Sequence, residues 1–473
     1  MLLREPARPA VVREHRLAPW LAVATVCFGA FMGQLDASIV TLAFPALQRQ
    51  FAIGLAGVQW VSLAYLLALV ALLVPVGRWS DRLGRKLVYL YGFVLFAGAS
   101  AACGLAPSLT VLVGLRVVQA AGAAMLQANS VALVATSAPP GRRRAALGVQ
   151  AMAQALGPVV GGLLVASAGW RWIFFVNVPV GVIAVLAGWF LLPRTRQFAR
   201  RRDGDPLGMT LLALAAVGML VAISSLSGLG LPVLALVGSA LAAVVATAGL
   251  IWWERRSPAP LIDLPLLTAA GIAPALGGAL CAYMVLFGPL VLLPQTLVAH
   301  GESALRAGLL LTALPAGFGL AAVAAERVLP GRWPNQRRCA AGGMVASCSV
   351  AALAIPGPAV LTGVSLALLG AGLGAYIPAN NAQIMAAIPA SDAATAGGMV
   401  NMTRGLGTAL GVAVVALGLH VGEGLGHADG GRLVIVALAA AALAAAWAGT
   451  RSTVANRAPR QANSPRCRPG GHR

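Results

Sequence analysis

The stretch Gly77-Arg78-Trp79-Ser80-Asp81-Arg82-Leu83-Gly84-Arg85-Lys86 lies between two long apolar segments and contains the only lysine of the chain. Four of its ten residues are cationic and one is acidic. Two apolar helices joined by so short a basic turn predict a transmembrane hairpin whose turn faces the cytoplasm. The glycines would allow a tight turn, and Asp81 could meet the positive end of a neighbouring helix or an arginine.

Composition places the whole chain in a membrane. Of its 473 residues 59% are hydrophobic and only 10% are charged, whereas a soluble globular chain has about 25% charged residues. In a soluble protein the net charge of +21 would suggest nucleic acid. Here the cations lie in short loops and in the C-terminal tail, where they set orientation and meet anionic lipid headgroups. We therefore expect the lipid bilayer as a partner and no nucleic acid.

The apolar segments predict an all-α membrane protein with fourteen transmembrane helices, because about 20 apolar residues are needed to cross a bilayer. The predicted spans are 19–45, 58–77, 87–106, 109–136, 145–168, 173–192, 207–227, 231–252, 271–298, 304–325, 339–356, 359–388, 394–418 and 432–449.

The distribution of arginine supports this topology. If the N-terminus is cytoplasmic, the predicted outer loops keep only Arg49, Arg171, Arg306 and Arg432, and nearly all other cations lie in cytoplasmic segments. This asymmetry predicts a multi-pass protein of the cell (plasma or inner) membrane with both termini in the cytoplasm.

We predict six segments along the chain. They are a cytoplasmic tail (1–18), an N-terminal six-helix bundle (19–192), a basic cytoplasmic linker (193–206), an inserted two-helix hairpin (207–252), a C-terminal six-helix bundle (253–449) and a basic cytoplasmic tail (450–473). No loop is long enough for a soluble catalytic domain, and the chain lacks a phosphate-binding P-loop. The six cysteines are scattered without metal-ligand spacing. We therefore expect no enzyme, no cofactor and no metal site.

Two charged residues fall inside predicted spans of the first half, Asp36 and Arg116. A charge at mid-bilayer costs about 2.5–3.5 kcal/mol on insertion scales, so such a residue is a functional candidate by default. Burial favours the neutral form of a carboxylate, which would suit Asp36 as a reversible proton carrier, whereas an arginine close to it would favour the charged form. The alternative is a purely structural hydrogen bond between helices.

Several motifs together resemble those of the fourteen-helix drug:proton antiporter branch of the major facilitator superfamily. They are the opening stretch, Leu35-Asp36-Ala37-Ser38-Ile39-Val40 with Pro45, Arg116-Val117-Val118-Gln119, Gly157-Pro158 with Gly161-Gly162, and Gly169-Trp170-Arg171-Trp172-Ile173-Phe174. The chain has Ser38 where the family usually has threonine and Ala120 where it has glycine. The interval from Gly148 to Gly157 is about one helical turn shorter than usual, which leaves the register of that span open.

The resemblance implies two six-helix bundles around a central cavity, opened alternately to each side. It implies a monomeric antiporter that exports hydrophobic or cationic small molecules, such as drugs or antibiotics, in exchange for protons. The alternative is an importer or facilitator of a small nutrient or metabolite on the same fold. It further implies proton coupling by Asp36 and Arg116, a conformational loop at Gly77, Asp81, Arg82, Gly84, Arg85 and Lys86, and an antiporter helix at Gly157, Pro158, Gly161 and Gly162.

Neutral polar residues within the predicted spans are candidates for the cavity wall. Together with one further arginine they are Gln34, Gln119, Gln127, Asn129, Asn380, Asn381, Gln383, Asn401 and Arg404. Hydrogen bonding between helices is an equally good interpretation of the asparagine and glutamine residues in the second half.

Overall fold

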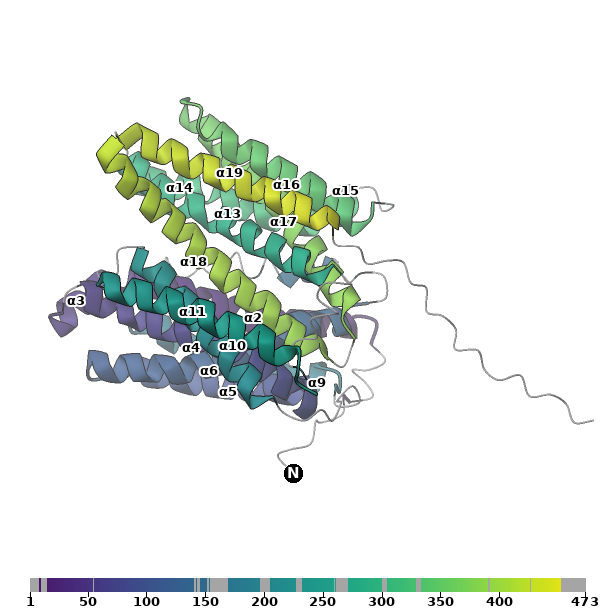
Figure 1. Cartoon of the computed structure of the whole chain (residues 1–473). Helices are drawn as coiled ribbons and strands as arrows, with labels where there is room; N and C mark the ends of the chain where they lie inside the picture. The colour runs from purple at the N-terminus through teal and green to yellow at the C-terminus, as the bar shows by residue number, and fades with distance from the viewer. Residues whose placement is uncertain are drawn as a thin grey trace, which may run out of the picture.

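The computed structural model describes residues 8–9, 15–53, 55–139, 142, 145–150, 153, 169–195, 205–226, 232–258, 260, 271–299, 304–328, 333–389, 392–425 and 427–451. Within these residues the chain forms helices and turns and no strand. The helices gather in two groups, one from each half of the chain, and α18 runs along the boundary between them (Figure 1).

The described helices follow one another closely. In the first half they are α2 (Ala18–Leu42), α3 (Phe44–Phe51), α4 (Leu55–Leu83), α5 (Arg85–Gly104), α6 (Leu109–Ser137), α8 (Trp172–Phe175) and α9 (Asn177–Leu191). Then come α10 (Pro206–Leu226) and α11 (Val233–Glu254). The second half has α13 (Ile272–Ala299), α14 (Ala304–Leu311), α15 (Ala313–Val328), α16 (Asn335–Ala352), α17 (Ala359–Ala387), α18 (Ala393–Leu425) and α19 (His427–Arg451).

Ten of the described helices are long and apolar enough to cross a membrane, and two further apolar helices have shorter windows, at Ala18–Gly33 and Leu309–Ala324. The helix α16, predicted as a span, is not among these ten. Most of the predicted span 145–168 lies outside the described residues. The structure thus establishes an all-helical membrane fold of many spans, and the count of fourteen stays a prediction.

Two predicted spans are interrupted, in each case near a proline. The span predicted over 19–45 ends at Leu42, and α3 begins at Phe44 with Pro45 in its first turn. The span predicted over 304–325 divides at Thr312 into α14 and α15, three residues before Pro315. Proline lacks the N–H that would continue the preceding helix and its ring crowds the previous turn, so a break at each site follows.

The opening stretch is more helical than a loop. The helix α4 continues through Leu83, and a single residue, Gly84, separates it from α5. Gly84 has φ = 106°, a conformation that L side chains rarely adopt. The glycine therefore allows the chain to turn sharply between two nearly continuous helices.

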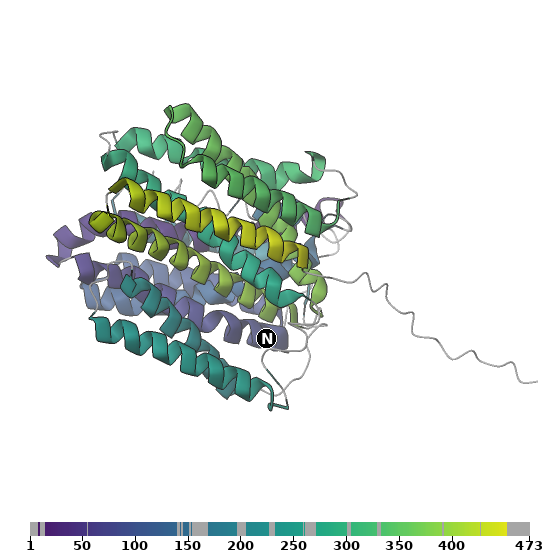
Figure 2. The same ribbon diagram turned by 45° about the horizontal axis from the view of Figure 1, so that its top comes forward.

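The predicted hairpin forms α10 and α11, and it is packed asymmetrically. The inner helix α10 packs against both α4 and α18, where Leu212, Ala216 and Leu220 are buried. The outer helix α11 keeps apolar side chains such as Leu234 and Val244 exposed, as a lipid-facing helix would. Figure 2 shows this hairpin at the edge of the molecule.

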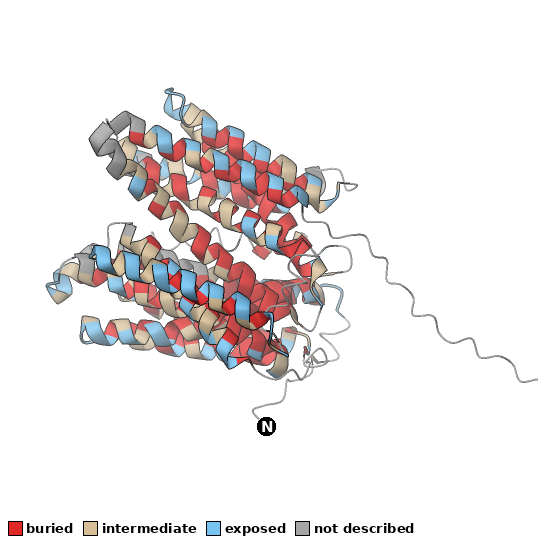
Figure 3. Ribbon diagram, viewed as in Figure 1, coloured by how far each residue is buried: buried red, intermediate tan, exposed pale blue. Residues whose placement is uncertain are grey.

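The two groups of helices meet most closely near the turn at Gly84. There a Cβ atom on Gly398 would lie 2.5 Å from the carbonyl oxygen of Leu73, and one on Gly77 would lie 2.6 Å from that of Ala394. Gly397 similarly approaches the backbone of Ala128. Glycine removes the side chains from this contact, so α18 touches α4 and α6 backbone to backbone. Buried residues concentrate on this side of the boundary (Figure 3).

Candidate functional site

The core of the first half contains a buried ion pair. A guanidinium nitrogen of Arg116, on α6, lies 2.6 Å from a carboxylate oxygen of Asp36, on α2, and the two side chains are 1% and 0% exposed. Gln119, one turn after Arg116, donates to the other oxygen of Asp36 at 2.9 Å and accepts from Arg116 at 2.7 Å. Arg116 also donates to the Val61 carbonyl at 3.1 Å. The three side chains satisfy one another, which is what burial of two charges requires.

An aromatic side chain covers this ion pair. The guanidinium of Arg116 lies 4.0 Å from the ring centroid of Tyr65 and 5.8 Å from that of Phe174. Both aromatic residues are fully buried, and a cation over a ring face is stabilised without needing water. The Asp36 carboxylate is therefore sealed from solvent in this conformation.

A cavity of about 310 Å³ lies between the two groups of helices. Its walls come from α2, α3, α4, α6, α10 and α18, and most lining side chains are apolar, such as Leu66, Val70 and Val412. Polar groups reach it from Gln59 and Ser62 on α4, Gln127 on α6, Ser224 on α10, and Asn401, Arg404 and Thr408 on α18. A mostly apolar cavity with a few convergent polar groups is typical of a small-molecule site.

One buried cation reaches this cavity, Arg404. Its guanidinium donates through Nη2 to the side-chain oxygen of Gln127, across the boundary between the two halves. Asn401, one turn earlier, donates to the Gln127 carbonyl at 2.7 Å, and Tyr283 lies beside the guanidinium. Among the described cavity-lining residues Arg404 is the only charged one.

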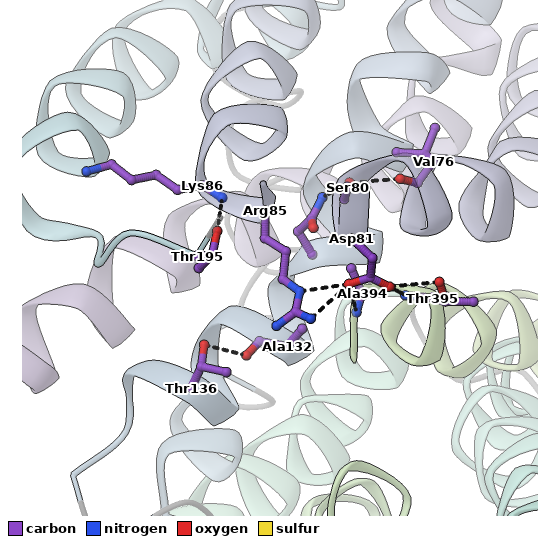
Figure 4. Close-up of polar contacts among 11 residues, drawn as sticks. Val76, Ser80, Asp81, Arg85, Lys86, Ala132, Thr136, Thr195, Ala394 and Thr395 are labelled. Carbon is purple, nitrogen blue, oxygen red and sulfur yellow. Dashed lines mark hydrogen bonds and ion pairs between the residues drawn. The ribbon is translucent and has the colours of Figure 1, made fainter. Parts of the chain in front are cut away.

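The second buried carboxylate, Asp81, joins the two halves. It accepts hydrogen bonds from the backbone N–H groups of Ala394 and Thr395 at 3.0 and 2.9 Å, and from the Thr395 hydroxyl at 2.8 Å. These groups form the first turn of α18, the positive end of its dipole. Arg85 lies 2.9 Å from the same carboxylate, and Figure 4 shows Asp81 between Arg85 and α18.

The rest of the opening stretch holds the first half together. The ammonium of Lys86 donates to the carbonyls of Trp189 and Leu192 at 2.8 Å each, at the C-terminal end of α9. Its backbone N–H donates to the Thr195 hydroxyl at 3.1 Å. A cation at the negative end of a helix is stabilising, so Lys86 fixes α9 to the start of α5.

The predicted cavity residues divide into two groups. Gln127, Asn401 and Arg404 line the cavity, whereas Gln119 belongs to the ion-pair cluster. Asn129 donates to the Ser80 hydroxyl at 2.8 Å, within the first half. The side chain of Gln34 lies outside the described residues, as do Gly157, Pro158, Gly161 and Gly162 of the predicted antiporter helix.

The candidates on α17 contact neighbouring helices and do not line this cavity. Asn380 donates to the Ala275 carbonyl on α13 at 2.9 Å, and Gln383 donates to the sulfur of Cys339 on α16 at 3.2 Å. Asn381 is buried beside them. In this conformation Asn380 and Gln383 pair with adjacent helices, as polar groups at the packed centre of a bundle do, and a role in the cavity wall stays a prediction.

Sequence reasoning missed Tyr65 and the contribution of the hairpin. An aromatic residue in an apolar helix gives no signal by itself, and its position over Arg116 depends on the packing of α4 against α6. Likewise Leu220, Ile223 and Ser224 of α10 line the cavity, although the sequence suggested only an insert between two bundles. The described residues contain no cluster of metal-ligating side chains.

Comparison with known proteins is consistent with this architecture. A family model described as Major Facilitator Superfamily matches residues 26–412. The tetracenomycin C resistance and export protein of Streptomyces glaucescens is 31% identical over 416 residues, covering 84% of this chain and 76% of that protein. The riboflavin transporter RibZ of Clostridioides difficile is 29% identical over 407 residues, covering 83% of this chain and 87% of that protein.

A solved structure has the same arrangement of helices. The human organic anion transporter MFSD10 superposes with a TM-score of 0.68, covering 91% of this chain and 99% of that chain at 16% identity. At this identity the likeness shows the fold alone.

Proposed function

Because the chain belongs to the major facilitator superfamily, whose members are membrane transporters and not enzymes, we propose that it is a proton-coupled exporter of hydrophobic small molecules. The observation that carries this proposal is a buried carboxylate inside a span, Asp36, in the same half of the protein as one wall of the cavity. Relatives that are resistance and export proteins support the direction of transport.

The proposed cycle uses alternating access between two rocking bundles. In this conformation the end of the boundary near Asp81 is closed by backbone contacts and hydrogen bonds. Opening of that end would break the bonds from Asp81 to α18 and admit substrate from the cytoplasm. Closing would re-form them and direct the cavity to the other side.

Proton coupling would operate through the ion pair. Protonation of Asp36 would remove the negative charge that holds Arg116 and Gln119, and this would loosen the packing of α2 against α6. Protonation from outside would then favour substrate release, and proton loss to the cytoplasm would favour binding. A proton entering the cell gains about 2.3 kcal/mol per 100 mV of membrane potential, and this energy would drive substrate outward.

The proposal extends to topology. We assign fourteen spans in two six-helix bundles, with α10 and α11 as an inserted hairpin, both termini in the cytoplasm of the cell (plasma or inner) membrane, and a monomeric protein. The close packing of α10 on α4 and α18 supports its treatment as a wall of the cavity. Reporter fusions after residues 168 and 252 should report outside and inside respectively, and a fusion after 252 reading outside would reject the inserted hairpin.

The test of function combines a screen with a proton measurement. Resistance profiling of an efflux-deficient strain that expresses the chain identifies compounds exported by it. Everted membrane vesicles are then energised, and each compound is added while a pH-sensitive dye reports the gradient. We expect exported compounds to dissipate the gradient in wild-type vesicles and not in Asp36→Asn vesicles. Dissipation of equal size in both would reject Asp36 as the coupling residue, with Glu326 the next candidate.

A second candidate function is import or facilitated diffusion of a small metabolite. The riboflavin transporter relative favours it. It predicts substrate entry into right-side-out vesicles that does not depend on an imposed pH gradient.

A further inference from the structure

The charge of the cavity gives a substrate class that the sequence did not suggest. The cavity is apolar over most of its wall, and Arg404 is the only charged side chain among its described lining residues. The remaining polar lining groups, including Gln59, Ser62 and Thr408, are neutral. A cationic substrate would meet a like charge there, at a site where water screens it poorly.

The other charges near the cavity do not cancel Arg404. Asp36 lies close enough to act electrostatically on Tyr65, as Arg404 does. The carboxylate is already held by Arg116 and Gln119 at 2.6 and 2.9 Å, so this pair is neutral in sum. The acceptors that face Arg404 are uncharged groups, the amide oxygen of Gln127 and the hydroxyl of Tyr283.

A guanidinium in this place is costly unless it has a ligand. Arginine within a membrane span is unfavourable on insertion scales. Arg404 is 9% exposed and lies on the cavity wall, and among the described residues no carboxylate pairs with it. Its planar fork of N–H donors matches carboxylates, sulfonates and phenolates.

We propose, resting on the transport function above, that the substrates are amphipathic organic anions. Their apolar body would pack against Leu66, Val70 and Val412, and their anionic group would displace or share the Gln127 amide at Arg404. This replaces the cationic substrates that the family resemblance implied. Because Gln127 belongs to the first half and Arg404 to the second, a bound anion would bridge the two bundles.

The test uses two dyes of nearly the same shape and opposite charge. Fluorescein and rhodamine 123 share the xanthene ring system, and fluorescein is an anion at a pH where rhodamine 123 is a cation. Binding of each dye to the purified full-length protein in detergent is followed by fluorescence anisotropy. We expect wild-type protein to bind fluorescein at least about tenfold more tightly than rhodamine 123, which corresponds to about 1.4 kcal/mol.

Two kinds of variant test whether Arg404 causes the preference for fluorescein over rhodamine 123. Arg404→Gln should abolish it, whereas Arg404→Lys should keep its direction because the charge remains. If Arg404→Gln does not fold, Thr408→Asp offers a second route. Residue 408 lies one helical turn after Arg404 on the same wall, so its carboxylate would pair with the guanidinium. Thr408→Asp should abolish the preference, because the pair it forms with Arg404 is neutral in sum, and Thr408→Asn should keep it.

The possible outcomes separate this inference from the transport function. Tighter binding of rhodamine 123 by wild-type protein, or a dye preference unchanged by both Arg404→Gln and Thr408→Asp, would overturn the anion assignment. If rhodamine 123 nevertheless dissipates the pH gradient in everted vesicles, the exporter function stands and only the substrate class fails. If no compound in the resistance screen dissipates the pH gradient, the exporter function fails. The dye-binding measurements still test the anion site in that case.

Discussion

Asp36 and Asp81 are both buried carboxylates paired with an arginine, but they differ in where their partners come from. Every described partner of Asp36 belongs to the first half of the chain. Asp81 pairs with Arg85 in its own half, yet three of its hydrogen bonds come from Ala394 and Thr395 in the second half. One carboxylate is internal to a bundle and the other bridges two bundles.

This difference separates two tasks that a coupled transporter must perform. In the proposed cycle, rocking of one bundle against the other would break the contacts of Asp81 with α18 and would leave the Asp36–Arg116 pair within its own bundle. On this proposal the Asp36 pair would respond to protons, while Asp81 would set the relative stability of the two open states. Substitutions at the two sites should consequently change different measurements.

The largest effect is expected for Asp36→Asn. A neutral amide cannot be protonated and deprotonated, so gradient-driven export should be lost, whereas exchange of substrate without a gradient should persist. The measurement is transport by proteoliposomes with and without an imposed pH gradient. Retention of uphill export would show that Asp36 is structural and would remove the functional difference between the two carboxylates.

The ion pair also changes what is expected for folding. From the sequence alone, removing a buried charge should ease insertion. In the structure Asp36→Asn leaves Arg116 buried without a counter-charge, and breaking such a pair costs about 3–5 kcal/mol, less where the amide still accepts a hydrogen bond. The double variant Asp36→Asn with Arg116→Gln should therefore unfold at a higher temperature than the single variant and remain unable to couple.

Gly398→Ala should have the next largest effect, and this effect should be confined to the contact between the two bundles near Asp81. Its Cβ would lie 2.5 Å from the Leu73 carbonyl oxygen, which belongs to the backbone and cannot move aside cheaply. The end near Asp81 should then fail to close, which spin-label distances between the bundles would report. The control is Gly405→Ala on the same helix, whose Cβ would lie 3.4 Å from a Val70 methyl group, an ordinary contact. Equal distances in both variants would show that close backbone approach is not required.

The sequence predicted much of the fold because the signals are local. The length of the apolar segments predicts most of the spans. Gly84 and the charged residues that flank it predict the sharp turn. The charged residues Asp36 and Arg116 were identifiable because a charge inside an apolar segment is rare. Their contact, which joins residues 80 positions apart, depends on the packing of α2 against α6. From the sequence, the proximity of the two residues follows only from the family resemblance, which implies that both take part in proton coupling.

The cavity was less predictable, because a polar residue in a span has the same local signature whether it lines a cavity or pairs with another helix. Gln127 and Arg404 line the cavity, whereas Asn380 and Gln383 donate hydrogen bonds to α13 and α16. The difference depends on the rotation of each helix about its axis. That rotation is set by the whole bundle and leaves no mark on the residue itself.

Asp81→Asn should have a moderate effect on conformational exchange. Hydrogen bonds to a charged group contribute about 1.5–3 kcal/mol, and neutral ones about 1 kcal/mol, so removing the charge should shift the balance between the two open states by about tenfold or more. Transport should slow, and substrate affinity measured in the favoured state should remain near that of wild type. A collapse of affinity with unchanged exchange would place Asp81 in the binding site.

The smallest effect is expected for Thr395→Val. This variant tests how much one of the three hydrogen bonds from α18 to Asp81 contributes to the contact between the two bundles. The substitution removes the hydroxyl that donates to Asp81 at 2.8 Å and keeps the two backbone N–H donors at 3.0 and 2.9 Å. Loss of one hydrogen bond to the charged carboxylate, about 1.5 kcal/mol, should shift the balance between states by about tenfold, in the same direction as Asp81→Asn and less than it, because Asp81→Asn weakens all three hydrogen bonds. Thr403→Val, on the same helix and away from Asp81, is the control. A shift as large as that of Asp81→Asn would mean that the hydroxyl, and not the helix end, carries the bridge; no shift would mean that the two backbone donors suffice.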